Sequence, residues 1–109
     1  MRTHLKTTGF EHTPAIDALA EEKLIRPVEK LTADIDERAD IPFDIEFELT
    51  THHHRKGKIW RAEAQIELPR VASLLRAEAT GEQLEEAVNR VKDELIREIK
   101  KYKERLRGE

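Results

Sequence analysis

The chain has 109 residues, 39% of them charged, with a formal net charge of −3, and this length fits one domain with a single core over residues 1–109. Cysteine is absent, which excludes disulfides, thiolate metal ligands and cysteine nucleophiles. The first residues lack the apolar core of a signal peptide and no segment approaches the roughly 20 apolar residues of a membrane span, so we expect a cytoplasmic protein.

A short strand and an amphipathic helix are predicted at the start of the chain. The strand covers residues 3–8 and ends at Gly9. Thr13 is expected to be the N-cap of the helix and Pro14 its first residue, because proline lacks an N–H that would be unpaired at this position. Apolar residues at helical spacing give this helix one buried side, and they are Ile16, Leu19, Ala20 and Leu24.

The end of this first helix contains a proline. Pro27 lacks an N–H and its ring clashes with the preceding turn, so we expect it to kink the helix or to restart it as a last turn through Val28 and Leu31. The acidic segment from Thr32 to Asp40 has no apolar period and is expected to be a solvated loop.

Three strands with alternating apolar and polar residues follow, over residues 43–49, 60–68 and 71–80. The alternation predicts a sheet with one buried and one wet face. The short connection at Pro69 and Arg70 predicts an antiparallel hairpin. The acids of the wet face are expected to form a solvated surface without a catalytic pair; they are Glu46, Glu48, Glu63 and Glu67.

A long amphipathic helix is predicted from about Glu82 to Arg107, with Gly108 as its stop. The element order is therefore β-α-β-β-β-α. Helices on opposite faces of the sheet would bury charged side chains such as Arg61 without evident partners. We therefore predict a two-layer α+β sandwich, with a four-stranded sheet and both helices on one face. Trp60 and Tyr102 fall on core-facing positions and are expected to pack there, not to stack on bases.

The surface of the last helix is strongly basic. Between Arg97 and Arg107 six cations stand against Glu98 and Glu104, a local excess of four positive charges in an acidic protein. Such a cluster favours a polyanion, since lysine and arginine release condensed counterions when they meet phosphates. The alternative is a solvated helix end whose cations suit the helix dipole.

The first helix adds three cations near its end. They either cap its last carbonyls or, if the two helices lie side by side, extend the cations of the last helix into a broad patch. The residues of this wider set are Lys23, Arg26 and Lys30 in the first helix, and Arg90, Arg97, Lys101 and Arg105 in the last.

A histidine run joins the first two of the three alternating strands. Adjacent histidines in a loop converge poorly on one ion, so we expect no metal site at His52, His53 and His54. The neighbouring cations would supply auxiliary phosphate contacts from a polar hairpin tip, and they are Arg55, Lys56 and Lys58. No nucleotide-binding, hydrolase or metalloprotease motif is present, so neither a cofactor nor enzymatic activity is expected.

Several short motifs agree in order and spacing. They are Gly9 with Thr13-Pro14, residues 22–24 and 28–31 of the first helix, the strand end Ala77-Glu78-Ala79-Thr80-Gly81, and the closing segment from Arg97 to Leu106. Together they resemble the ribosome hibernation-promoting factor and ribosome-associated inhibitor A family, also called sigma modulation proteins. The resemblance covers nearly the whole chain, which resembles the short form without a second domain that pairs ribosomes.

This resemblance implies a fold similar to double-stranded RNA-binding domains. It also implies binding to the small ribosomal subunit and its rRNA, in the channel for messenger and transfer RNA, which idles ribosomes under stress. The family's basic positions fall on Lys23, Arg26, Arg97, Lys101, Lys103 and Arg105. With Lys30, Arg90 and Lys100 they complete the predicted rRNA-binding set. Glu94 departs from the family, whose members commonly have a lysine there, and Pro27 disturbs the register near Arg26.

The mechanism that the residues support needs no chemistry. A basic domain in an rRNA-lined channel would exclude transfer RNA and messenger by its volume, with its cations on phosphates and without sequence readout. The alternative function is a protein-interaction module that regulates transcription factors through the acidic sheet face, with the basic helix as a solvated edge. Neither DNA nor a membrane is an expected partner.

Overall fold

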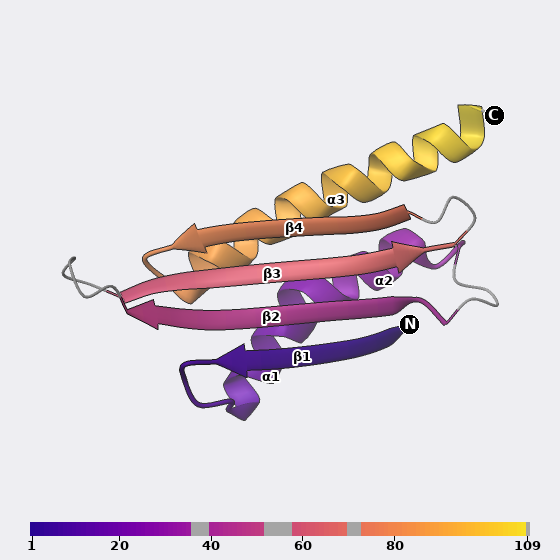
Figure 1. Ribbon diagram of the computed structural model, residues 1–109. Helices are drawn as coiled ribbons and strands as arrows, with labels where there is room; N and C mark the ends of the chain where they lie inside the picture. Colours follow the sequence, from indigo (N-terminus) through magenta and orange to yellow (C-terminus); the bar gives the residue numbers. More distant parts are fainter. Residues whose placement is uncertain (36–39, 52–57, 70–72, 109) are drawn as a thin grey trace.

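The computed structural model describes residues 1–35, 40–51, 58–69 and 73–108. A strand, a helix, three strands and a long helix follow one another, as the sequence predicts (Figure 1). The first helix consists of three consecutive segments, α1, η1 and α2. The elements are β1 (Arg2–Thr8), α1 (Pro14–Ala20), η1 (Glu21–Ile25), α2 (Arg26–Thr32), β2 (Pro42–Thr51), β3 (Lys58–Leu68), β4 (Ser73–Gly81) and α3 (Leu84–Gly108).

The four strands form one open mixed sheet in the order β1-β2-β3-β4. Strand β1 is parallel to β2, because the helix between them carries the chain back to the same end of the sheet. Strands β2 and β3, and β3 and β4, are antiparallel, which confirms the predicted pairing across Pro69. The predicted third alternating strand began at Val71, whereas β4 is described from Ser73.

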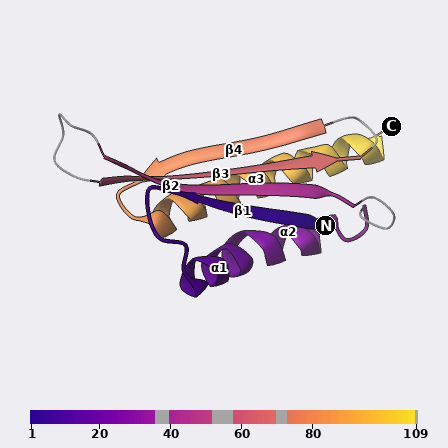
Figure 2. The same cartoon turned by 60° about the horizontal axis from the view of Figure 1, so that its bottom comes forward.

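Both helices lie on one face of the sheet, as predicted (Figure 2). The α+β sandwich buries the apolar residues of β2, β3 and β4 against the two helices, with Phe43, Phe47 and Ile66 fully inside. Tyr102 of α3 is buried, as predicted. Trp60 lies at the margin of the core, where its ring packs edge to face on Phe10 at a centroid distance of 4.9 Å.

The first helix passes through Pro27 by means of a π-helical turn. The Arg26 N–H donates to the carbonyl of Glu21, five residues back, in the turn immediately before the proline. A wider turn accommodates a ring that would clash with the Lys23 carbonyl in an α-helix. The predicted restart is confirmed, since α2 begins at Arg26 with Pro27 in its first turn and runs on through Val28 and Leu31, while the expanded turn of η1 joins it to α1.

Two helix boundaries and one capping bond differ from the sequence predictions. Thr32, predicted to open a solvated loop, is the buried last residue of α2, and its hydroxyl donates to the carbonyl of Val28 at 2.8 Å. Thr13 is at the N-cap position, but its side chain makes no capping bond. Helix α3 begins at Leu84, two residues later than predicted, and Gly108 is its last described residue.

Candidate nucleic-acid interface

Helix α3 presents the basic surface that the sequence predicts. Its apolar stripe packs on β3 and β4, and Val91, Leu95 and Ile99 are fully buried. The last turns rise past the β4 edge of the sheet (Figure 1). Five cations of this region are exposed, and they are Arg97, Lys100, Lys101, Arg105 and Arg107.

Four of these exposed cations have no close ionic partner within the described part of the chain, and among them Arg107 lies near enough to Asp34 to help lower the pKa of its carboxyl. Arg97, Lys100, Arg105 and Arg107 form no ion pair with any residue in the described ranges. Lys101 has only a long contact, 3.7 Å, between its ammonium and the carboxylate of Glu98. Their charge is thus available to an external anion.

Other predicted cations are already engaged inside the protein. The Arg90 guanidinium donates to the main-chain oxygen of Thr80 at 2.7 Å and pairs with Glu86 at 2.7 Å. The Lys103 ammonium donates to the main-chain oxygen of Leu31 at 2.9 Å. In the first helix, two cations pair with acids at longer range: Lys23 with Glu85 at 3.8 Å, and Arg26 with Glu21 at 3.6 Å.

These contacts place the predicted cations on two flanks of α3. Arg90 reaches β4, and Arg97 and Lys101 follow it at steps of seven and four along the same flank. Lys103 reaches α2 on the opposite flank, where Lys23 also meets α3 through Glu85. The two helices therefore lie side by side, but their cations line both sides of α3.

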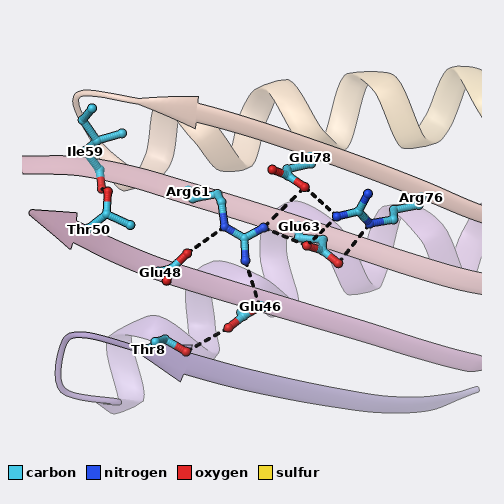
Figure 3. Close-up of polar contacts among 9 residues, drawn as sticks. All are labelled: Thr8, Glu46, Glu48, Thr50, Ile59, Arg61, Glu63, Arg76 and Glu78. Atoms are coloured by element: carbon cyan, nitrogen blue, oxygen red, sulfur yellow. Dashed lines mark hydrogen bonds and ion pairs between the residues drawn. The ribbon is translucent and has the colours of Figure 1, made fainter. Parts of the chain in front are cut away.

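The open face of the sheet carries a polar network that the sequence did not predict (Figure 3). Arg61, at its centre, donates to three glutamates on two strands: to Glu48 from Nε at 2.8 Å, to Glu63 from Nη1 at 2.7 Å, and to Glu46 from Nη2 at 2.9 Å. A fourth carboxylate, that of Glu78, lies 3.5 Å from Arg61.

Neighbouring side chains extend this network to all four strands. The Arg76 guanidinium donates to Glu63 and to Glu78 at 3.0 and 2.6 Å. The Thr8 hydroxyl of β1 donates to Glu46 at 2.8 Å. The bonds from Arg76, and then those from Arg61, lower the pKa of Glu63 to about 2. The prediction of a solvated acidic surface is therefore corrected at three of its four positions: Glu46, Glu48 and Glu63 are half-buried and bonded to Arg61, and Glu67 is exposed.

The family model described as sigma 54 modulation protein / S30EA ribosomal protein matches residues 3–107 of the chain. The chain belongs to this family. The match confirms the family resemblance of the short motifs. The family is one of ribosome-associated proteins, and is not known as a family of enzymes.

Solved structures of similar proteins share this fold. The N-terminal domain of protein Y from Thermus thermophilus is 27% identical, with a TM-score of 0.70, over 94% of this chain and 99% of that one. A ribosomal subunit interface protein from Coxiella burnetii shares the fold at 24% identity and a TM-score of 0.68, over 94% of this chain and 98% of that one. No curated protein sequence matches the chain.

Part of the predicted contact set of this S30EA-family chain lies outside the described residues. These positions are Arg55 and Lys56, with the histidines His52, His53 and His54; Lys58 is the first residue of β3. Within the described ranges no three histidines or acids are arranged to hold a metal ion. None of the described helices is both long and apolar enough to cross a bilayer.

Proposed function

We propose that this protein binds the small ribosomal subunit through its rRNA and inhibits translation by occupying the channel for messenger and transfer RNA, under stress or in stationary phase. The observation that carries the proposal is the set of unpaired cations on α3, in a protein whose net charge is −3. Membership of the S30EA family supports the ribosome as the partner.

The mechanism is electrostatic and steric. Arg97, Lys100 and Arg105 are exposed and free to contact phosphates, and each contact releases condensed counterions from the RNA. Structured RNA is recognised mainly by shape and by its backbone, so a rigid helix that carries cations suffices without base readout. The bound domain then excludes messenger and transfer RNA from the volume that it occupies.

The uneven distribution of charge between the two faces of the molecule favours one docking orientation on RNA. On the open sheet face two arginines, Arg61 and Arg76, stand among four glutamates, so the face keeps an excess of negative charge and offers little to a polyanion. The helical layer, by contrast, carries cations without such partners. Phosphates therefore attract the helical face, and the sheet faces away from the RNA.

Sedimentation with purified small subunits tests the proposal. If about five phosphates are neutralised, the logarithm of the binding constant falls with the logarithm of the salt concentration with a slope of several units. A messenger RNA that contains a stem-loop, bound to the small subunits together with transfer RNA before the protein is added, should block binding of the protein. Association that is insensitive to salt, or that is unaffected by these competitors, would contradict the proposal.

The sheet-face alternative has less support. A regulator that docks on acids needs carboxylates that are free to bind, whereas four glutamates of this face are engaged by Arg61, and in the described ranges only Asp44 and Glu67 are exposed there without an ion pair. Capture of partners from lysate with and without nuclease separates the two functions, since RNA-dependent capture is lost after digestion.

A further inference from the structure

Lys103 lies among the cations of α3, but its ammonium is turned inward. It donates to the main-chain oxygen of Leu31 at 2.9 Å and to the carboxylate of Asp34 at 3.1 Å. Only 17% of its side chain is exposed, compared with 60% for that of Lys101. Two of its three N–H donors are thus occupied by the protein itself.

The Leu31 carbonyl is a natural target for this cation. Leu31 lies in the last turn of α2, where the carbonyls of a helix have no partner within the helix. A cation at this end also complements the negative end of the helix dipole. Asp34 lies just beyond the helix, and its bond with Lys103 lowers the pKa of its carboxyl. Lys103 therefore supplies from α3 the cap that α2 lacks.

The neighbours of Lys103 are the unpaired cations. Lys100 precedes it by three residues, and Arg105 and Arg107 follow it within about one turn. Beyond the buried Tyr102, Leu106 is the one residue of these last turns that packs partly on the core, among the residues described. Two polar ties in the described ranges therefore hold the end of α3 to the rest of the fold: the hydrogen bond from the Tyr102 hydroxyl to the Pro69 carbonyl on the sheet side, and the bonds of Lys103 on the α2 side.

We propose that Lys103 is a positioning residue, which fixes the end of α3 against α2 so that Lys100, Arg105 and Arg107 face the RNA in one arrangement. Its own charge is used inside the protein. This inference rests on the proposed function, and it gives Lys103 a different role from the phosphate contact that the family resemblance implies. Asp34 shares the positioning role through its bond to Lys103.

The direction in which Asp34→Ala changes the affinity for RNA distinguishes a positioning role of Lys103 from a direct contact with phosphate. Asp34→Ala removes a negative charge, so electrostatics alone predicts tighter binding to RNA. If Asp34 helps to hold Lys103, the same variant binds more weakly, by about threefold for an exposed pair. Asp93→Ala is the matched control, because Asp93 is exposed on α3 and forms no ion pair within the described ranges; it should bind about threefold more tightly.

A double-mutant cycle with Lys103→Met completes the test, measured by sedimentation with purified small subunits. Lys103→Met keeps the alkyl chain and removes the donors. Once Lys103 is absent, Asp34→Ala can no longer release it, so the effect of Asp34→Ala should reverse towards that of Asp93→Ala, with the attraction between Asp34 and Arg107 as the remaining difference. If Asp34→Ala tightens binding equally in both backgrounds, Lys103 is an ordinary phosphate contact and the inference is overturned, whereas the proposed function stands.

A second measurement does not depend on the ribosome. Amide hydrogen exchange in the free protein should be faster in the last turns of α3 for Asp34→Ala and Lys103→Met, and unchanged for Asp93→Ala. Unchanged exchange in all three variants would overturn the inference. If the parent protein fails to bind small subunits, the proposed function fails, and hydrogen exchange alone then decides whether Lys103 fixes the helix end.

Discussion

Arginines on the two layers of this protein have opposite environments. Arg61 on the open sheet face is 20% exposed and lies within 4.0 Å of four carboxylates, whereas Arg97 on α3 is exposed and has no ionic partner among the described residues. The first arginine holds strands together, and the second is available to a partner. The number of cations on a surface therefore says less about binding than the number left unpaired.

The largest expected effect comes from reversing charge on α3. Arg97→Glu combined with Lys101→Glu should weaken binding to the small subunit at least a hundredfold, because two attractive charges become repulsive. Both residues lie away from the buried stripe, so the stability should change by no more than about 0.5 kcal/mol. Sedimentation measures the binding, and thermal unfolding followed by circular dichroism checks the fold.

A charge-matched variant on β1 serves as the control for this pair. Arg2→Glu combined with Lys6→Glu makes the same change in net charge at exposed positions of the sheet. It should bind nearly as well as the parent at moderate salt. Equal losses for the two double variants would mean that net charge alone, and not the α3 surface, governs binding.

The next effect concerns stability and leaves binding intact. Arg61→Met leaves four glutamates without their common counter-charge and should lower the free energy of unfolding by about 2 kcal/mol. Arg76→Met, at an exposed position with two glutamate partners, should cost less. Urea unfolding measures both. A folded Arg61→Met protein that no longer binds small subunits would show that the sheet face takes part in recognition.

A smaller effect compares two arginines of the same helix flank. Arg97→Ala should reduce the slope of binding against salt by about one unit, the value expected for one lost phosphate contact. Arg90→Ala should change the slope less, since Arg90 is engaged with Glu86 and with the Thr80 carbonyl. Equal changes in slope would indicate that Arg90 leaves its internal partners when RNA binds.

The smallest effect is a pH dependence of stability. The pKa of Glu63 is lowered from 4.5 to about 2 in the folded protein, so its ionised form stabilises the fold above about pH 4.5 and this contribution is lost as the pH falls towards 2. Glu63→Gln should flatten the decline of unfolding free energy over this range. Glu67 is exposed on the same strand, so Glu67→Gln should leave this decline unchanged. Identical curves of unfolding free energy against pH for the parent and Glu63→Gln would rule out this role of Glu63.

Local patterns predicted most of the fold. Alternation along residues 43–49 and 60–68 places Phe43, Phe47 and Ile66 in the core, because side chains of a strand alternate between its faces. The parallel pairing of β1 with β2 was not predicted, since it depends on the path of the helix between them and not on either strand. The π turn before Pro27 also escaped prediction, because several local geometries accommodate a proline within a helix.

The site was predicted less completely for a similar reason. Helical spacing separated the exposed cations of α3 from its buried stripe, but it gave no information on their partners. Lys103 bonds a carbonyl 72 residues away, and Arg61 bonds glutamates 13 and 15 residues away on a neighbouring strand. Such pairs require the strand register and the helix packing. The alternation did place Arg61 among glutamates on one face, which was the available signal.

The parallel pairing of β1 with β2 has a consequence for how the chain acquires its fold during synthesis. Leu5 pairs with Ile45, so the first strand to leave the ribosome waits for about forty residues before its partner exists. Strands β2, β3 and β4 follow one another closely and pair antiparallel, which lowers the loop-closure entropy of their assembly. We therefore expect β1, the first strand to be made, to join the sheet last. Until then the unpaired backbone of β1 is exposed to other chains.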